Sequence, residues 1–133
     1  MSRRSDERGA SAVEFALVAP LLFLVMFGIL QYGYHYWALE TAAATAREAA
    51  RHYAVGAGQT CTQTEAQRRA GTAALGPVTV SAPPSSPTVG QVITVTVSFQ
   101  SLDMHIFPLP DNGYVSESAT ARIENVPTTA LTC

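Results

Sequence analysis

The sequence contains little charge and no lysine at all. Charged residues make up 14% of its 133 residues, all eight cations are arginines, and the formal net charge is −2. A nucleic-acid-binding surface needs clustered basic residues, so nucleic acid is excluded as a partner. The two cysteines, Cys61 and Cys133, are too few for a structural metal site and too far apart for a redox motif.

Motifs of common catalytic and cofactor-binding sites are also missing. The sequence contains no G-x-S-x-G elbow, no phosphate loop and no dinucleotide fingerprint. His35, His52 and His105 are scattered, and none has a second ligand at a metal-binding spacing. We therefore expect no enzyme activity, no cofactor, no bound metal and no small-molecule substrate.

One long stretch without formal charge dominates the N-terminal part of the chain. It fills the 25 positions between Glu14 and Glu40, and about 20 apolar residues suffice for a helix to cross a bilayer. Arginines precede this run, and the next cation is Arg47. By the positive-inside rule the N-terminus is cytoplasmic and the C-terminal part lies outside the cytoplasmic membrane.

A cleaved secretory signal peptide is the alternative interpretation of this run. The alanines at 42–44 could mimic its cleavage site. The apolar segment is too long for a signal peptide, however, and it ends in three tyrosines and Trp37. Such aromatics are typical of the membrane interface, where we also place His35. A retained membrane anchor is therefore favoured.

The segment in front of the apolar run carries a recognisable pattern. Gly9 is followed by Ala-Ser-Ala-Val-Glu-Phe-Ala-Leu-Val, and Pro20 lies one residue beyond the next alanine. This pattern resembles the processing site of type IV prepilins and, with Pro20, the TadE family of pseudopilins. The resemblance implies that a prepilin peptidase cleaves between Gly9 and Ala10. It makes Glu14 the fifth residue of the mature chain.

The spacing of Ala10 and Glu14 has a physical rationale. Cleavage creates an ammonium group on Ala10, and a carboxylate one helical turn away, on the same or a neighbouring subunit, can neutralise it in a low dielectric. An isolated carboxylate at the start of an apolar run would otherwise cost several kcal/mol. We therefore assign Glu14 a role in assembly.

The predicted fold is α+β, with one long helix first. Residues 1–9 form an unstructured cytoplasmic leader, and a helix begins at Ser11 or Ala12. Residues 10–37 are its transmembrane segment, and 38–133 form an exported domain. The helix continues to Gly56 as a rod of about 44 residues, or about 65 Å. Pro20 should kink it, either as a tolerated irregularity of a membrane helix or as a means to change packing.

The exported part is predicted to contain a short helix and three strands. Thr62 and Glu65 fit a capping box for a helix over 63–75. Alternating apolar residues predict strands over 78–82, 91–99 and 114–124, with an irregular apolar loop over 102–110. These strands should form a small antiparallel sheet packed on the exported half of the long helix. The same shape is implied by the TadE resemblance.

Two functions remain open from the sequence. The resemblance implies a pseudopilin or minor pilin of the tight-adherence (Flp-type) pilus. Such a protein is inserted in the cytoplasmic membrane and can be built into a surface pilus. Its partners would be a prepilin peptidase, related pilins and pseudopilins, and the membrane assembly platform. The alternative is a single-pass envelope protein whose sheet domain binds a ligand or cell-wall component. In either case Cys61 and Cys133 lie in the exported part, where they can pair or remain two thiols.

Overall fold

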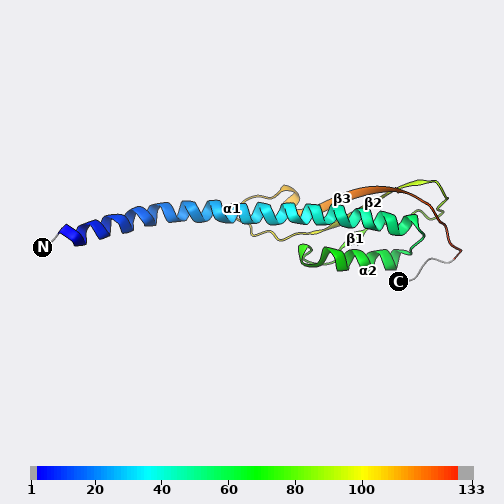
Figure 1. Ribbon diagram of the computed structural model, residues 1–133, viewed down its shortest axis with the longest axis horizontal. Helices are drawn as coiled ribbons and strands as arrows, with labels where there is room; N and C mark the ends of the chain where they lie inside the picture. The colour runs from blue at the N-terminus through cyan, green and yellow to red at the C-terminus, as the bar shows by residue number, and fades with distance from the viewer. Residues whose placement is uncertain (1–2, 129–133) are drawn as a thin grey trace.

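The computed structural model describes residues 3–128 and has the predicted α+β architecture (Figure 1). A long helix comes first and a three-stranded sheet follows. The elements in chain order are α1 (Arg3–Ala54), α2 (Gln59–Ala70), the 3-10 turn η1 (Gly71–Ala73), β1 (Thr79–Val80), β2 (Val92–Gln100), the 3-10 turn η2 (Pro110–Gly113) and β3 (Tyr114–Arg122).

Helix α1 is longer than the sequence analysis predicted. It has 52 residues, about 78 Å at about 1.5 Å per residue, and it begins at Arg3 instead of Ser11 or Ala12. The prediction of an unstructured leader is therefore wrong for the described part of residues 1–9. Gly9 costs a helix only about 1 kcal/mol relative to alanine, so it does not end the helix.

The C-terminal end of α1 is fixed by a glycine, as predicted. Gly56 has a positive φ of 93° and follows the last helical residue by two positions. Its N–H donates to Tyr53 O at 3.1 Å, and Ala57 N–H donates to His52 O at 2.9 Å. This pair of bonds is a Schellman motif, which satisfies carbonyls that have no partner within the helix.

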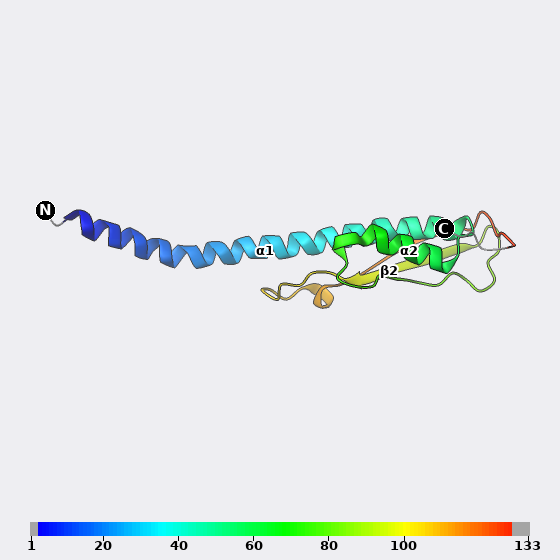
Figure 2. The same cartoon turned by 90° about the horizontal axis from the view of Figure 1, so that it is seen from below.

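Helix α1 continues across Pro20 without a break. Figure 2 shows a bend in its blue N-terminal half, where the helix stands alone. Proline removes one backbone hydrogen bond and clashes with the preceding turn, so a bend in this half is the expected result. The role of Pro20 in changing helix packing stays a prediction.

The sheet has the strand order β1-β2-β3, with both pairs antiparallel. The register places Val97 opposite Val80 on one side and Glu117 on the other. Strands β2 and β3 confirm the predicted alternation. In β2 every second residue from Ile93 onward is buried, and in β3 every second residue from Val115 onward is buried or half-buried. Polar residues line the other face, where the Thr96 and Ser118 hydroxyls are 2.8 Å apart.

The domain has two layers, with α1 and α2 side by side on one face of the sheet (Figures 1 and 2). A row of alanines on α1 faces the strands, which allows the sheet to approach the helix closely along this row. The fully buried members of this row are Ala38, Ala42, Ala46, Ala49 and Ala50. Larger side chains from the strands fill the space over them, including Val95, Val97, Phe99 and Val115.

The predicted N-terminus of the second helix is wrong. Helix α2 begins at Gln59, with Gly58 at the N-cap position and no side-chain cap. Cys61 therefore lies inside the helix, and the Thr62 hydroxyl donates to Gly58 O one turn back at 3.1 Å. Glu65 pairs with arginines of its own helix instead of capping it. Tertiary contacts override the local capping signal here, because the side chains of this early turn bind β1.

Three glutamines of α2 occupy the free edge of β1. Gln59, Gln63 and Gln67 follow one another at intervals of four residues and therefore lie on one face of the helix. Gln67 Nε2 donates to Gly76 O at 3.1 Å, and its Oε1 accepts from Val78 N–H at 2.8 Å. Gln63 Oε1 accepts from Val80 N–H at 3.1 Å. The amides thus replace a fourth strand and protect an edge that would otherwise be open to pairing.

Candidate functional site

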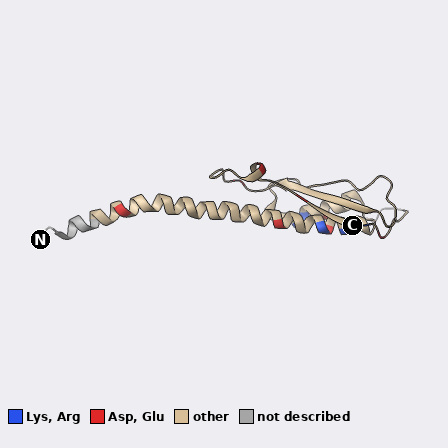
Figure 3. Ribbon diagram, turned by 90° about the horizontal axis from the view of Figure 1, so that it is seen from above, with Lys and Arg blue, Asp and Glu red and all other residues tan. Residues whose placement is uncertain are grey.

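The N-terminal half of α1 projects away from the folded domain as an exposed apolar helix. Beyond the residues drawn in grey, Figure 3 shows this half almost without charge, with acidic and basic residues gathered mainly over the domain. An 18-residue window within Gly9–Ala54 has a mean hydropathy of 2.5 and is only 6% buried, so this helix is long and apolar enough to cross a membrane. Its exposed apolar side chains include Phe15, Leu17, Leu21, Leu22, Phe23, Leu24, Val25, Met26 and Phe27.

The residues predicted for processing lie at the free end of this helix. Gly9, Ala10 and Glu14 are exposed. Apart from the neighbouring helix backbone, no described atom lies within 4 Å of the position that a Cβ on Gly9 would occupy. Ala10 and Glu14 share one helix face, about 6 Å apart along the axis. Gly9 is helical, so a peptidase that needs an extended backbone must unwind α1 there. Glycine lowers the cost of that unwinding by about 1 kcal/mol.

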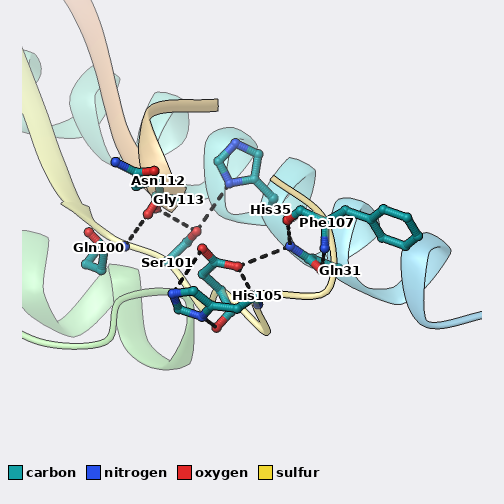
Figure 4. Close-up of polar contacts among 9 residues, drawn as sticks. Gln31, His35, Gln100, Ser101, His105, Phe107, Asn112 and Gly113 are labelled. Carbon is teal, nitrogen blue, oxygen red and sulfur yellow. Dashed lines mark hydrogen bonds and ion pairs between the residues drawn. The ribbon is translucent and has the colours of Figure 1, made fainter. Parts of the chain in front are cut away.

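A loop of the folded domain, residues 101–109, returns to α1 and is held there by Gln31 (Figure 4). Gln31 is fully buried. Its Nε2 donates to Phe107 O at 2.7 Å and to Asp103 Oδ1 at 3.1 Å. Its Oε1 accepts from Phe107 N–H at 3.2 Å. One side chain therefore satisfies both backbone polar groups of Phe107.

His35 is buried one turn further along α1, and its place at the membrane interface stays a prediction. Its Nδ1 lies 3.2 Å from the Ser101 hydroxyl, which donates to Gly113 O at 2.8 Å. Because the single hydroxyl proton goes to Gly113 O, Nδ1 of His35 carries the proton in the other bond. Ser101 is itself fully buried. The contact explains why a polar ring is tolerated under the sheet.

Phe107 extends the contact between domain and helix toward the N-terminus. A Cβ on Gly28 would lie 2.9 Å from Phe107 Cε2, so only glycine lets the ring approach this closely. The Tyr32 hydroxyl donates to Pro108 O at 2.9 Å. Packing between helix and domain therefore begins at Gly28, several residues before the domain boundary predicted at 37/38.

A cluster of charges joins α2 to the middle of the domain-bound half of α1. Arg69 lies 3.4 Å from Glu48 of α1 and 3.0 Å from Glu65 of its own helix. The pKa of Glu65 is lowered to about 2, mainly by the hydrogen bonds that Arg68 donates to its carboxylate. The pairs are partly exposed, so each contributes little to stability.

The structure describes one of the two cysteines that were predicted to pair. Cys61 is half-buried in α2, and Cys133 lies outside the described residues. The Cys61–Cys133 bond therefore stays a prediction.

The sequence analysis missed Gln31 as an important residue. Gln31 is the only amide side chain among the 25 uncharged positions after Glu14. A strongly polar group in a membrane-spanning run is costly unless it has a partner inside the protein. That rule signals a buried contact at Gln31, although it does not identify the loop that supplies it.

Comparison with known proteins agrees with the pattern at Gly9. Residues 9–51 match the family model described as TadE-like protein. The chain is therefore similar to this family over residues 9–51. The match covers almost the whole of α1 from Gly9 onward and ends before the sheet domain. No curated protein and no solved structure matches the chain. The TadE-like segment supports an involvement with the tight-adherence pilus system, and a long apolar N-terminal helix fits a membrane anchor in a pilus protein.

Proposed function

We propose that this protein is a pseudopilin, or minor pilin, which takes part in assembling a tight-adherence pilus. A prepilin peptidase removes residues 1–9, and the mature chain remains in the cytoplasmic membrane through α1. Its partners are related pilins and pseudopilins and the membrane assembly platform. Its role is structural rather than catalytic. The TadE-like match over residues 9–51 supports this assignment.

The single observation that carries the proposal is the exposed apolar half of α1. An apolar helix of this length is stable only if lipid or other helices cover it. The bilayer covers it before assembly, and neighbouring subunits can cover it in a fibre. The helix joins directly to the alanine row under the sheet, so helix and domain would move between these environments as one body.

Glu14 is the residue whose chemistry links the two environments. After cleavage the ammonium of Ala10 lies near the start of the apolar run, where an unpaired charge is costly. Glu14 neutralises this ammonium, either within one chain or between neighbouring subunits. Loss of one member of a buried ion pair typically costs about 3–5 kcal/mol. We expect the lower end, because the bilayer edge is wetter than a protein core.

The proposal is tested by comparing Glu14→Gln with a matched control, Glu40→Gln. Glu40 is the exposed carboxylate at the other end of the same uncharged run. Intact-mass measurement of membrane-extracted protein should find residues 1–9 removed in both variants, because cleavage precedes assembly. Glu14→Gln should lose pilus-dependent adherence and co-purification with other pilins, whereas Glu40→Gln should keep both. Full adherence with correctly processed Glu14→Gln protein would contradict the assembly role.

A pocket at the far end of the domain favours the alternative function. It has a volume of about 270 Å³ and is lined mainly by glycine, proline and apolar side chains, among them Tyr53, Pro83, Ile93 and Pro127. A single-pass envelope protein could bind a ligand or cell-wall component there. Such a protein would not need cleavage, so an intact mass that retains residues 1–9 beside an active prepilin peptidase would favour this alternative.

A further inference from the structure

The loop that Gln31 holds against α1 lies beside the apolar run that is proposed to cross the membrane. If the hydrocarbon region begins at Phe15, directly after Glu14, about 20 residues at about 1.5 Å each bring it to Tyr34. Phe107 packs on Gly28, which lies about 9 Å inside that limit. Figures 2 and 3 show the loop extending along α1 toward its free half.

The side chains of this loop are unusually apolar for an exposed segment. Met104 is 36% exposed and Ile106 is 41% exposed. The Phe107 ring stands over α1 and forms an apolar notch with Leu24, Val25, Gly28, Ile29 and Tyr32. The notch and the tip of the loop adjoin the exposed apolar side chains of α1. The same apolar medium can therefore cover the loop and the helix.

The backbone of the loop has partners within the protein at Phe107 and Pro108. Irregular backbone is tolerated at membrane depth only where its polar groups have partners within the protein. Gln31 satisfies the N–H and the carbonyl of Phe107, and Tyr32 donates to the carbonyl of Pro108. Pro108 and Pro110 have no N–H that would need a partner. His105 is the polar exception at the tip, and its Nε2 lies 3.7 Å from Asp103 Oδ2.

We propose that residues 104–108 form a second membrane contact, which inserts Met104, Ile106 and Phe107 into the outer leaflet beside α1. The occupant of this surface is the bilayer that α1 itself spans, and the notch takes acyl chains. The contact holds the sheet domain down on the membrane at a fixed height. Departure from the bilayer then requires the loop and α1 to leave the lipid together. The inference rests on the membrane insertion of α1 in the proposed function.

The test uses tryptophan fluorescence of the full chain reconstituted in phospholipid vesicles. The chain has one tryptophan, so Trp37→Phe provides a silent background for a single new tryptophan. Ile106→Trp reports on the loop, and Phe23→Trp reports on the spanning half of α1. Val89→Trp, an exposed residue of the connection before β2, is the matched control on the opposite end of the domain. Each variant is measured in ordinary lipid and in lipid with brominated acyl chains.

We expect brominated lipid to remove most of the emission of Ile106→Trp and Phe23→Trp, with both maxima shifted to shorter wavelength. Val89→Trp should keep its full intensity at the wavelength of tryptophan in water. Unquenched, water-like emission of Ile106→Trp beside a quenched Phe23→Trp would overturn the loop contact and leave the proposed function intact. Failure of Phe23→Trp to be quenched would overturn membrane insertion itself, and with it both proposals. Emission of Ile106→Trp that shifts only at high protein-to-lipid ratio would overturn the lipid contact and assign the loop to a second copy of this chain.

Discussion

The contact between Gln31 and Phe107 makes the position of the loop depend on one side chain. Gln31→Leu keeps the size of the side chain and removes three hydrogen bonds. Both backbone polar groups of Phe107 then lose their partners. Each unsatisfied buried group costs about 1–3 kcal/mol. The two bonds to Phe107 are only partly buried, so the upper end does not apply and the loop should be destabilised by roughly 2–4 kcal/mol. The cost should be local, because the three lost hydrogen bonds join Gln31 only to Asp103 and Phe107 of the loop.

Hydrogen exchange measured by mass spectrometry on the full chain in detergent or lipid can detect this change. Destabilisation by roughly 2–4 kcal/mol corresponds to exchange roughly 30- to 700-fold faster, at about 1.4 kcal/mol per factor of ten. The faster exchange should be confined to peptides that cover residues 101–109. Gln67→Leu is the matched control, since it removes the same amide from Val78 and Gly76 at the edge of β1. It should accelerate exchange around residues 76–80 and leave the loop unchanged.

The prediction separates a local contact from a general loss of stability. Equal acceleration in the loop and in β2 after Gln31→Leu would mean that the substitution unfolds the domain. Unchanged exchange in the loop would refute the reasoning that Gln31 holds it in place. Tyr32→Phe adds a graded comparison, because it removes a single exposed hydrogen bond, which typically contributes about 0.5–1.5 kcal/mol.

Three further predictions concern processing, the cysteines and acid stability. Gly9→Val should reach the membrane with residues 1–9 still attached, because a peptidase that seats glycine has no room for a branched side chain; mature-length protein in that variant would refute the cleavage site. Cys61 and Cys133 should resist alkylation until reductant is added, and reduction should lower the free energy of unfolding by up to about 4 kcal/mol; two thiols labelled without reductant would refute the bond. The pKa of Glu65 is lowered from 4.5 to about 2, chiefly by the hydrogen bonds from Arg68, so its stabilising contribution is complete above about pH 4.5 and is lost as pH falls through about 2. The thermal unfolding temperature should therefore drop less over this window in Glu65→Gln than in the unsubstituted protein, and equal drops would exclude Glu65 as a cause.

The sequence alone determined the elements whose signals are local and repeated. The charge-free run after Glu14 predicted a membrane-length helix, since length and hydropathy are properties of consecutive residues. The alternation of apolar and polar residues over 91–99 predicted β2 and its buried face. Gly56 predicted the end of α1, because glycine readily adopts the positive φ that is found there. The pattern from Gly9 to Glu14, with Pro20, indicated the TadE resemblance through consecutive residues alone.

The tertiary structure alone decided which polar groups meet. Thr62 and Glu65 form a valid capping pattern, yet α2 begins earlier because its glutamines bind the edge of β1, which lies elsewhere in the sequence. Gln31 and His35 lie in the uncharged run of α1, and their partners lie more than 60 residues away in the sequence. Local sequence records how a segment prefers to fold. It does not record which distant backbone groups will need a hydrogen-bond partner once the layers have packed, because that need arises only when water is excluded.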